Sequence, residues 1–330
     1  MPIATQLEIL DLRHFSARQL RPLLETEAAV WEDRLRWNYR GSTELLLQYL
    51  DSRILPGFVA LDRGRVCGFA FCVYEGHKAV VGDAYAIGSD SAQTLLITNT
   101  LLHHLLDLLL NSPNINRIES QLLLYDTGAI NDIFLRAGFT MYPRLFMEYN
   151  FPPPGSTVLG LNGNHATPFD LPPNIELARW TTASYQAAAE LIHESYTGHI
   201  DALINDQYCS LHGSLRFLHN IVRFPGCGVF EADHSWILRD RTTGALTAMV
   251  LCSRVADNVA HITQLCVRTT SRGHHYGRKL LQHCMSHLSA AGFRALTLTV
   301  TEGNQQAVKL YEGVGFFTRH HFDAMVHEKP

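Results

Sequence analysis

The chain contains the same sequence pattern twice, and this constrains its fold more than any other feature. The first half ends near "RIESQLLLYDTGAINDIFLRAGF" and the second near "RALTLTVTEGNQQAVKLYEGVGF". Arg117 aligns with Arg294 and Phe139 with Phe316, both at an offset of 177. Earlier, "GRVCGFAFCVYEGHKAVVGDAYAI" parallels "GALTAMVLCSRVADNVAHITQLCV" at an offset of 180. The sequence therefore predicts an internal duplication of about 150 residues.

A segment rich in Pro and Gly separates the two copies. It reads "NFPPPGSTVLGLNGNHATPFDLPPN" and shows neither a helical nor a strand period. A length of 330 residues also favours two domains. We therefore predict a first domain at residues 1–150, a linker at 151–174 and a second domain at 175–330.

Composition excludes several classes of protein. The chain is 46% hydrophobic and 18% charged, so it can bury a sizeable core. Its net charge of -4 and the lack of a long basic run argue against a nucleic-acid partner. Seven cysteines without a C-x-x-C pair indicate neither a disulfide framework nor a zinc ribbon. Reduced thiols are typical of a cytoplasmic protein.

Neither the N-terminus nor the most apolar run indicates a membrane protein. "MPIATQLEILDLRHF" lacks the basic start and apolar core of a secretory signal. Two histidines and an aspartate interrupt "TLLITNTLLHHLLDLLL", which is also short for a membrane span. We predict that this run is a buried helix and that the protein is cytoplasmic.

The second copy alternates strands with helices. Apolar runs predict strands near 245–254, 259–267 and 295–300. Apolar residues at helical spacing predict a helix over 277–291, and a good N-cap begins a short helix over 304–312. This order predicts an α/β (α+β) fold.

The loop between the second of these strands and the long helix has the features of a phosphate site. It reads "RTTSRGHHYGRKLL". Gly273 and Gly277 let the backbone approach a ligand closely, and the free N–H groups of a helix start favour an anion. Arg272 and Arg278 add positive charge. An ordinary strand-to-helix turn is the alternative. No G-K-[ST] follows, so this is not a Walker loop.

Two motifs together resemble the GNAT superfamily of acyl-CoA-dependent N-acetyltransferases. The family's pyrophosphate loop, [Q/R]-x-x-G-x-[G/A], falls on residues 272–277. Its N-x-x-A-x-x-L-Y-x-x-x-G-F segment falls on 304–316 with every position matched. The close resemblance covers roughly residues 245–317. His275 departs from it, because the family usually has Gly there.

The resemblance implies two tandem GNAT-like domains. Each would have a mixed, mostly antiparallel central sheet with a splayed parallel strand pair, flanked by helices. Acetyl-CoA would lie between the strands at 259–267 and 295–300, and no metal is expected. The implied cofactor-binding residues are Leu265, Cys266, Val267, Arg272, Gly273, His274, His275, Tyr276, Gly277, Arg278 and Asn304.

The implied reaction is transfer of an acetyl group to a primary amine of a small molecule or peptide. Tyr311 matches the family's usual general acid, and a core aromatic residue is the alternative reading. His261 stands near the position of a family glutamate base, although a buried, hydrogen-bonded histidine is an equal alternative. The residues that would line the acceptor side stay unranked: Glu194, Tyr196, His199, Asp201 and Asp206.

The first copy lacks the chemistry of the second. At the offset of 177, Tyr311 becomes Phe134, which has no hydroxyl. The loop region has no glycine after Gly88. We therefore predict a degenerate, non-catalytic first domain. Three roles stay open for it: shaping the acceptor site, packing against the second copy, or forming a homodimer. A tandem with one active half resembles the layout of mycothiol synthase, as an architectural analogy.

Two other functions compete with catalysis. Eighteen histidines, with His283 and His287 at helical spacing, suggest a metal site, but no H-E-x-x-H is present and surface histidines are the simpler reading. A non-catalytic acyl-CoA sensor or scaffold is the second alternative. Retention of Tyr311 argues against it, because binding alone does not need that hydroxyl.

Overall fold

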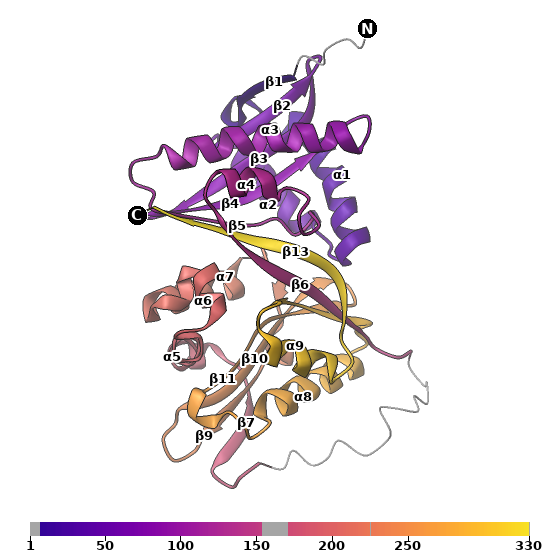
Figure 1. Cartoon of the computed structure of the whole chain (residues 1–330). Helices are drawn as coiled ribbons and strands as arrows, with labels where there is room; N and C mark the ends of the chain where they lie inside the picture. The colour runs from indigo at the N-terminus through magenta and orange to yellow at the C-terminus, as the bar shows by residue number, and fades with distance from the viewer. Residues whose placement is uncertain (1–6, 154–170, 225, 330) are drawn as a thin grey trace. The chain divides into compact units, whose positions relative to one another are not determined.

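The structure, a computed structural model, describes residues 7–153, 171–224 and 226–329. It divides into two compact units (Figure 1). Unit 1 comprises Met1–Arg144 with His320–Pro330, and unit 2 comprises Leu145–Arg319. The sequence prediction drew the boundary differently, with all of 175–330 in the second domain. Most of the predicted linker, 154–170, lies outside the described residues.

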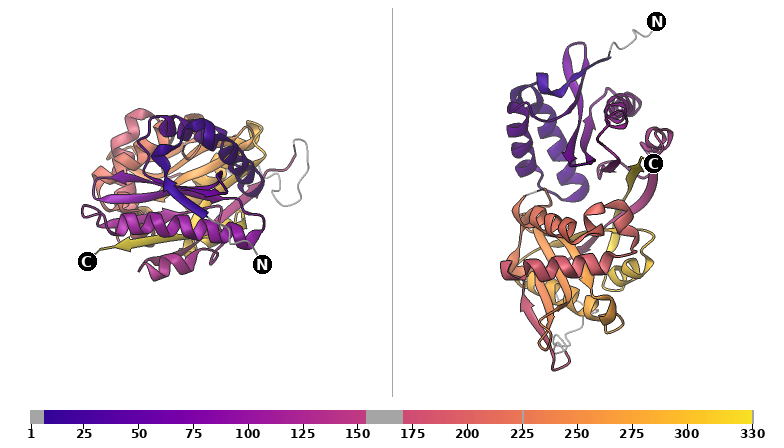
Figure 2. Two further views of the ribbon diagram at one scale, coloured as in Figure 1. Left: turned by 90° about the horizontal axis from the view of Figure 1, so that it is seen from above. Right: turned by 90° about the vertical axis from the view of Figure 1, so that its left-hand side faces the viewer.

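Unit 1 has a mixed sheet in the strand order β1-β2-β3-β4-β5-β13. Helices α1 and α2 pack on one face of it, and α3 and α4 on the other (Figure 2). The elements are β1 (Leu7–Asp11), α1 (Ala17–Leu35), α2 (Arg40–Asp51), β2 (Gly57–Asp62), β3 (Arg65–Glu75), β4 (Lys78–Ala86), α3 (Ser91–Leu110), β5 (Arg117–Gln121), α4 (Asn131–Arg136) and, from His320 on, β13 (Phe317–Glu328).

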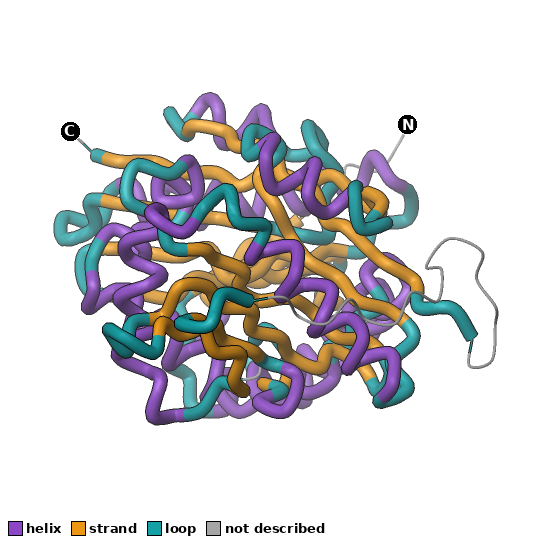
Figure 3. Tube along the Cα trace, turned by 90° about the horizontal axis from the view of Figure 1, so that it is seen from below, coloured by secondary structure: helices purple, strands orange, loops and turns teal. Residues whose placement is uncertain are grey.

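Unit 2 repeats this arrangement with the order β6-β12-β11-β10-β9-β7, and β8 pairs with β10. Helices α8 and α9 cover one face, and α5 and α7 the other (Figure 1). Figure 3 shows the backbone from below, with helices and strands in different colours. The elements are, from Leu145 on, β6 (Thr140–Asn150), then β7 (Ile175–Arg179), α5 (Tyr185–Tyr196), α6 (Ile200–Ile204), α7 (Leu211–Arg223), β8 (Val229–Phe230), β9 (Trp236–Asp240), β10 (Leu246–Ala256), β11 (Val259–Val267), α8 (Tyr276–Ala290), β12 (Ala295–Thr301) and α9 (Gln305–Glu312).

Each unit contains a strand from the far side of the predicted boundary. The end of β13 pairs with β5 in an antiparallel register, and the end of β6 lies beside β12. Alternation of apolar residues shows that a segment is a strand, but it does not show which sheet the strand joins. The sequence pattern therefore could not place these two strands.

The parallel strands β11 and β12 stop pairing before either strand ends. Among the described residues their pairing runs from Val259–Ala295 to Ile262–Leu298. Both strands then continue, β11 to Val267 and β12 to Thr301. The antiparallel pairing of β10 with β11 has a register shift between Leu251 and Cys252, next to the point where β11 and β12 stop pairing. Such bulges redirect a strand locally, and the predicted splayed pair is confirmed.

In unit 1, the parallel strands β4 and β5 separate in the same way. Their parallel pairing runs from Lys78–Arg117 to Val81–Ser120, and β4 continues beyond it to Ala86. The mixed sheet predicted for both copies is confirmed.

Matching features of the sheets refine the alignment of the two copies. The register shifts at Phe71/Cys72 of β3 and Leu251/Cys252 of β10 correspond at the offset of 180 that the sequence alignment gave, as do the positive-φ glycines Gly64 and Gly244 before these strands. In the next strand of each unit, β4 and β11, the offset is 181, because Lys78 and Val259 begin them.

The most apolar run of the sequence lies in α3. Its buried face includes Leu101, Leu105 and Leu109, which pack into the core of unit 1, as predicted. No helix of the described residues is both long and apolar enough to cross a membrane.

Candidate active site

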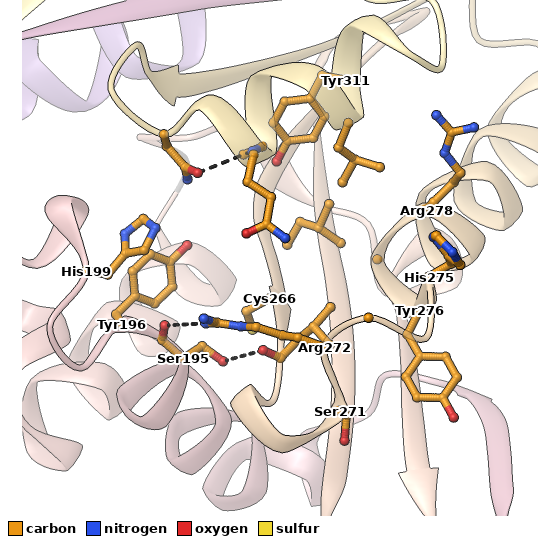
Figure 4. Close-up of a pocket in the computed structure, with 18 residues that line it drawn as sticks. Ser195, Tyr196, His199, Cys266, Ser271, Arg272, His275, Tyr276, Arg278 and Tyr311 are labelled. Carbon is orange, nitrogen blue, oxygen red and sulfur yellow. Dashed lines mark hydrogen bonds between the residues drawn. The ribbon is translucent and has the colours of Figure 1, made fainter.

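A cavity of about 350 Å³ opens in unit 2 where β11 and β12 separate. Its walls come from four places: the end of β11, the first turn of α8, the helix α9, and the segment after α5 (Figure 4). Main-chain groups of a splayed strand lack their sheet partners, so they are available to a ligand. The fold thus produces a cleft with exposed backbone on one side.

The turn before α8 exposes the helix N-terminus to this cavity. After Val267 the chain forms a short 3-10 turn, Thr269–Ser271, and Gly273 then adopts a φ of 86°. The first intrahelical bond of α8 runs from the N–H of Lys279 to the carbonyl of His275 (3.0 Å). The N–H groups of the first turn have no partner within the helix and favour an anion.

His275 occupies a backbone conformation that explains the family's preference for glycine. It is the N-cap of α8 with φ 60° and ψ 18°, in the left-handed region. Glycine adopts this region freely, whereas a residue with a Cβ atom is strained there by about 1–2 kcal/mol. Histidine is among the better tolerated exceptions. The substitution therefore preserves the turn at a modest cost in stability.

Two guanidinium groups lie at the cavity in fixed positions. Arg272 Nη2 donates to the carbonyl of Ser195 (3.0 Å), and Arg278 Nη2 donates to the carbonyl of Gly313 (3.2 Å). Among the described residues neither has a carboxylate as an ion-pair partner. Their positive charges are therefore not neutralised, and they add to the helix N-terminus in favouring an anion.

Tyr311 lines the cavity from α9 and is buried. Asn304 Oδ1 accepts from the N–H of Ala307 (3.2 Å) and so caps the start of this helix. In Figure 4 the ring of Tyr311 points from α9 toward the side chains at the end of α5 and on β11. Burial, followed by the charge of Asp201, raises the pKa of Tyr311 above its ordinary value. The phenol therefore keeps its proton at neutral pH.

The opposite wall consists of aromatic side chains. Tyr196 and His199 line the cavity, and Tyr196 stacks on Tyr208 with ring centroids 4.2 Å apart. Burial raises the pKa of Tyr196 well above its ordinary value. Burial also raises the pKa of the Cys266 thiol to about 12, so Cys266 lines the cavity as a protonated side chain rather than a nucleophile.

The cavity brings together all but two of the predicted site residues. The residues that line it are Leu265, Cys266, Val267, Arg272, Gly273, His275, Tyr276, Gly277, Arg278, Asn304 and Tyr311. His274 is exposed and stacks on Tyr276. His261 is buried beside Phe146, with Nδ1 2.9 Å from Thr297 Oγ1.

The position of His261 follows from the register of the sheet. It lies opposite Thr297, in the part of β11 that still pairs with β12. The cavity opens only beyond Ile262, where that pairing has ended. The structure therefore places His261 in the sheet rather than in the cavity, which agrees with the alternative of a buried, hydrogen-bonded histidine and not with a base that faces the acceptor.

Three further residues line the cavity although the motifs did not indicate them: Ser195, Ser271 and Gln306. Ser195 Oγ donates to the carbonyl of Val267 (3.3 Å), and so ties the end of α5 to the end of β11. Ser271 and Gln306 stand at variable positions beside the two motifs, so only the folded chain identifies them. Of the five unranked acceptor-side candidates, Tyr196 and His199 line the cavity.

The histidines at helical spacing pack on an aromatic side chain. The rings of His283 and His287 lie 4.3 Å and 4.7 Å from that of Trp236. Burial lowers the pKa of His283 to about 4, which keeps the ring neutral. No group of three or more potential metal ligands occurs among the residues that the structure describes.

Unit 1 has counterparts of two of these walls, the short helix and the N-terminus of the long helix, with different side chains. The N–H of Phe139 donates to the carbonyl of Phe134, as the N–H of Phe316 donates to that of Tyr311, both at 3.0 Å. Phe134 is therefore the counterpart of Tyr311. The N-cap of α3 is Asp90, whose carboxylate accepts from the N–H of Gln93 (2.8 Å). A carboxylate thus occupies the helix N-terminus that would otherwise favour an anion.

Comparisons with known proteins agree with this arrangement. The model of the acetyltransferase (GNAT) family matches residues 197–316. A GCN5-related N-acetyltransferase from Sphaerobacter thermophilus is similar in structure, with a TM-score of 0.65 and 14% identity over 98% of this chain and 96% of that one. A tandem GNAT protein from the clavulanic acid biosynthesis pathway has a TM-score of 0.56 and 14% identity over 98% of each chain.

A GNAT-family acetyltransferase from Colwellia psychrerythraea has a TM-score of 0.52 and 14% identity over 98% of this chain and 100% of that one. No curated protein sequence matches the chain. The matched family domain includes the cavity of unit 2 from His199 to Tyr311, and the structural similarity extends over both units. Residues 197–316 of unit 2 therefore match the acetyltransferase (GNAT) family, and the chain as a whole shares its fold with solved GNAT structures, a tandem GNAT protein among them.

Proposed function

We propose that unit 2 transfers an acetyl group from acetyl-CoA to a primary amine. One observation supports this most directly. The open N-terminus of α8, a buried, protonated phenol and two guanidinium groups that pair with no carboxylate of the described residues all line a single cavity. The first two features suit the pyrophosphate of CoA, and the third suits a leaving thiolate.

The residues of the cavity fit the two ends of an acyl-CoA. The pyrophosphate would lie at the first turn of α8, near Arg272 and Arg278. Leu265–Val267 would offer main-chain hydrogen bonds to the pantetheine arm, because β11 no longer pairs with β12 there. Acetyl-CoA supplies the activated thioester, and the chain supplies the binding and the proton transfers.

Tyr311 is the proposed general acid. A CoA thiolate has a pKa of about 8–9, by analogy with cysteine, so it leaves more readily when it receives a proton. Burial keeps the phenol of Tyr311 protonated until that moment. The thiol of Cys266 also lines the cavity, but burial keeps it protonated, so it is not proposed as a nucleophile.

Unit 1 is proposed to be non-catalytic. Phe134 has no hydroxyl to donate, and Asp90 would repel a pyrophosphate at the start of α3.

The test is a thiol-release assay on the full chain, with acetyl-CoA and a panel of primary amines that includes amino acids, aminosugars, polyamines and peptides. Isothermal titration of acetyl-CoA is run in parallel. Thiol release that depends on one class of amine supports the proposal. Tight binding of acetyl-CoA without release over the whole panel contradicts catalysis and favours the alternative, an acyl-CoA sensor or scaffold.

A further inference from the structure

One wall of the unit 2 cavity contains a histidine with no role in the scheme above. His199 stands between α5 and α6 and lines the cavity together with Tyr196 and Tyr311 (Figure 4). Its Nδ1 is 3.1 Å from the backbone nitrogen of Asp201 and 3.5 Å from carboxylate oxygen Oδ2 of the same residue. Since both contacts use Nδ1, Nε2 is the ring nitrogen left for a molecule in the cavity.

The two contacts of Nδ1 belong to different protonation states. A neutral ring with its proton on Nε2 accepts from the N–H of Asp201 and has no lone pair for the cavity. A neutral ring with its proton on Nδ1 donates to the Asp201 carboxylate and turns the lone pair of Nε2 to the cavity, so this second form is the one that can act as a base. An imidazolium has protons on both nitrogens, so it pairs with the Asp201 carboxylate and presents Nε2–H to the cavity. Asp201 thus stabilises the ring after His199 has taken up a proton.

Asp201 is suited to this positioning role. Its side chain is only 14% exposed, and one carboxylate oxygen accepts from the hydroxyl of Thr301. Among the described residues, His199 is its one ion-pair partner. A largely buried carboxylate without a lysine or arginine partner favours a cation nearby. Its charge also contributes, after burial, to the raised pKa of Tyr311. This end of the cavity therefore favours an ammonium group.

We propose that His199, positioned by Asp201, is the base that takes a proton from an aliphatic ammonium acceptor, an inference that rests on the acetyl transfer proposed above. The proton moves from the ammonium nitrogen to Nε2. The amine lone pair then forms a C–N bond to the thioester carbonyl carbon, the C–S bond breaks, and the thiolate takes the proton of Tyr311. The second proton of the nitrogen restores Tyr311, and His199 releases its proton to water.

The acceptor class follows from the need for a base. An aliphatic amine has a pKa of about 10.4, so only about one molecule in a thousand is neutral at pH 7. An amine that is already neutral at pH 7, such as methoxyamine, has no such need. His199 should therefore matter for aliphatic amines and much less for methoxyamine.

Several other ionisable or charged groups surround the cavity, and each must be considered as a proton acceptor beside His199. They are Tyr196 of α5, Tyr208 beside it, Cys266 of β11, Arg272 of the loop, Tyr311 of α9 and, in the turn that packs on Ile200, Glu302. Burial raises the pKa of Tyr196, Cys266 and Tyr311, so these three stay neutral near pH 7. None of these three side chains therefore offers a deprotonated group that could accept the proton in place of His199.

The first experiment needs no acceptor. The ring nitrogens of His199 are observed by NMR in the full chain, in wild-type protein and in Asp201→Asn. His212, exposed on α7, is the reference ring in the same spectra. We expect the fraction of the His199 ring with its proton on Nδ1 to fall in Asp201→Asn, because the carboxylate no longer accepts that proton, while the ring of His212 does not change. An unchanged fraction for His199 would overturn the pairing.

The second experiment measures thiol release by His199→Gln, with His212→Gln as the matched control. With aliphatic amines we expect a loss of about 100-fold in kcat, an unchanged Kd for acetyl-CoA, and a much smaller loss with methoxyamine. The unchanged Kd also shows that the variant is folded. Equal losses for both kinds of amine would overturn the inference. Release that is unaffected by His199→Gln would overturn this inference alone, whereas no release by wild-type protein would overturn the acetyl transfer as well.

Discussion

Unit 1 and unit 2 build the same turn around different side chains. In both, a backbone bond of 3.0 Å closes the turn after the short helix, from Phe139 to Phe134 in one unit and from Phe316 to Tyr311 in the other. The glycine before each phenylalanine has a positive φ, 80° at Gly138 and 102° at Gly315. At the residue whose carbonyl accepts this bond, Tyr311 has a hydroxyl and Phe134 does not. The backbone pattern that specifies the fold is thus separate from the side chain proposed for catalysis.

The long helices differ in the same way at their N-termini. In unit 1 the carboxylate of Asp90 caps α3, whereas in unit 2 His275 precedes α8 in the left-handed region. A carboxylate cap stabilises a helix and repels a second anion, while the strained turn leaves the N–H groups open. The comparison indicates that the open N-terminus of α8 has a cost in local stability that the capped α3 does not have.

The largest expected effect comes from giving unit 2 the residue of unit 1. Tyr311→Phe should lower kcat about 100- to 1,000-fold, because the leaving thiolate loses its proton donor. The Kd for acetyl-CoA should stay within about threefold, since the ring still fills the same space. Steady-state kinetics and isothermal titration separate the two effects, with Tyr49→Phe on the exposed side of α2 as control. Unchanged turnover would exclude Tyr311 as the acid.

The second test places a carboxylate at the N-terminus of α8, as Asp90 does at α3 in unit 1. His275→Asp should weaken acetyl-CoA binding about tenfold or more, because a negative charge would face the pyrophosphate. His275→Asn is the neutral control, and both residues tolerate the left-handed region. Equal affinity of the two variants would show that the pyrophosphate lies elsewhere.

The reciprocal change, Phe134→Tyr, tests whether the core of unit 1 is fully packed around Phe134. Phe134 is fully buried, so Phe134→Tyr would bury a hydroxyl without a designed partner. We expect the free energy of unfolding to fall by about 1–3 kcal/mol and no new thiol release. Urea unfolding with an unchanged m-value measures this. A neutral effect would indicate an unfilled space beside Phe134, as in an active unit.

A buried carboxyl pair in unit 1 gives a pH-dependent comparison. Burial, followed by the charge of Asp83, raises the pKa of Glu27 well above its ordinary value, and unit 2 has Gln264 at the position of Asp83 in the repeat. Above about pH 4.5 the unfolded chain releases the Glu27 proton while the folded chain keeps it, so stability falls as pH rises. Glu27→Gln should therefore lose less stability than wild type between pH 5 and pH 7. Parallel pH dependence of the two proteins in urea unfolding would contradict this.

The smallest expected effect concerns the strained turn itself. His275→Gly should raise the free energy of unfolding by up to about 1 kcal/mol, because glycine adopts the left-handed region freely. The gain in the native state is partly offset by the greater entropy of the unfolded chain. Thermal unfolding of the two proteins measures the balance. A clear loss of stability would show that the imidazole of His275 makes a compensating contact.

The sequence indicated most of the residues that line the cavity, but not the sheets that two of its strands join. The loop and the helix of Tyr311 are local in sequence, and their glycines and caps reflect local backbone needs, so their spacing was enough to group these residues. For His261 the sequence left open a base or a buried histidine, because apolar alternation does not show where the pairing of β11 and β12 ends. The strands β6 and β13 were misassigned because their partners lie far away in the sequence.

Isothermal titration of acetyl-CoA into the full chain tests the central contrast between the two units most directly. An open helix N-terminus in unit 2 and a carboxylate-capped one in unit 1 predict one molecule bound per chain, with that binding weakened by His275→Asp. Two molecules bound per chain, or one that is unaffected by His275→Asp, would contradict the account.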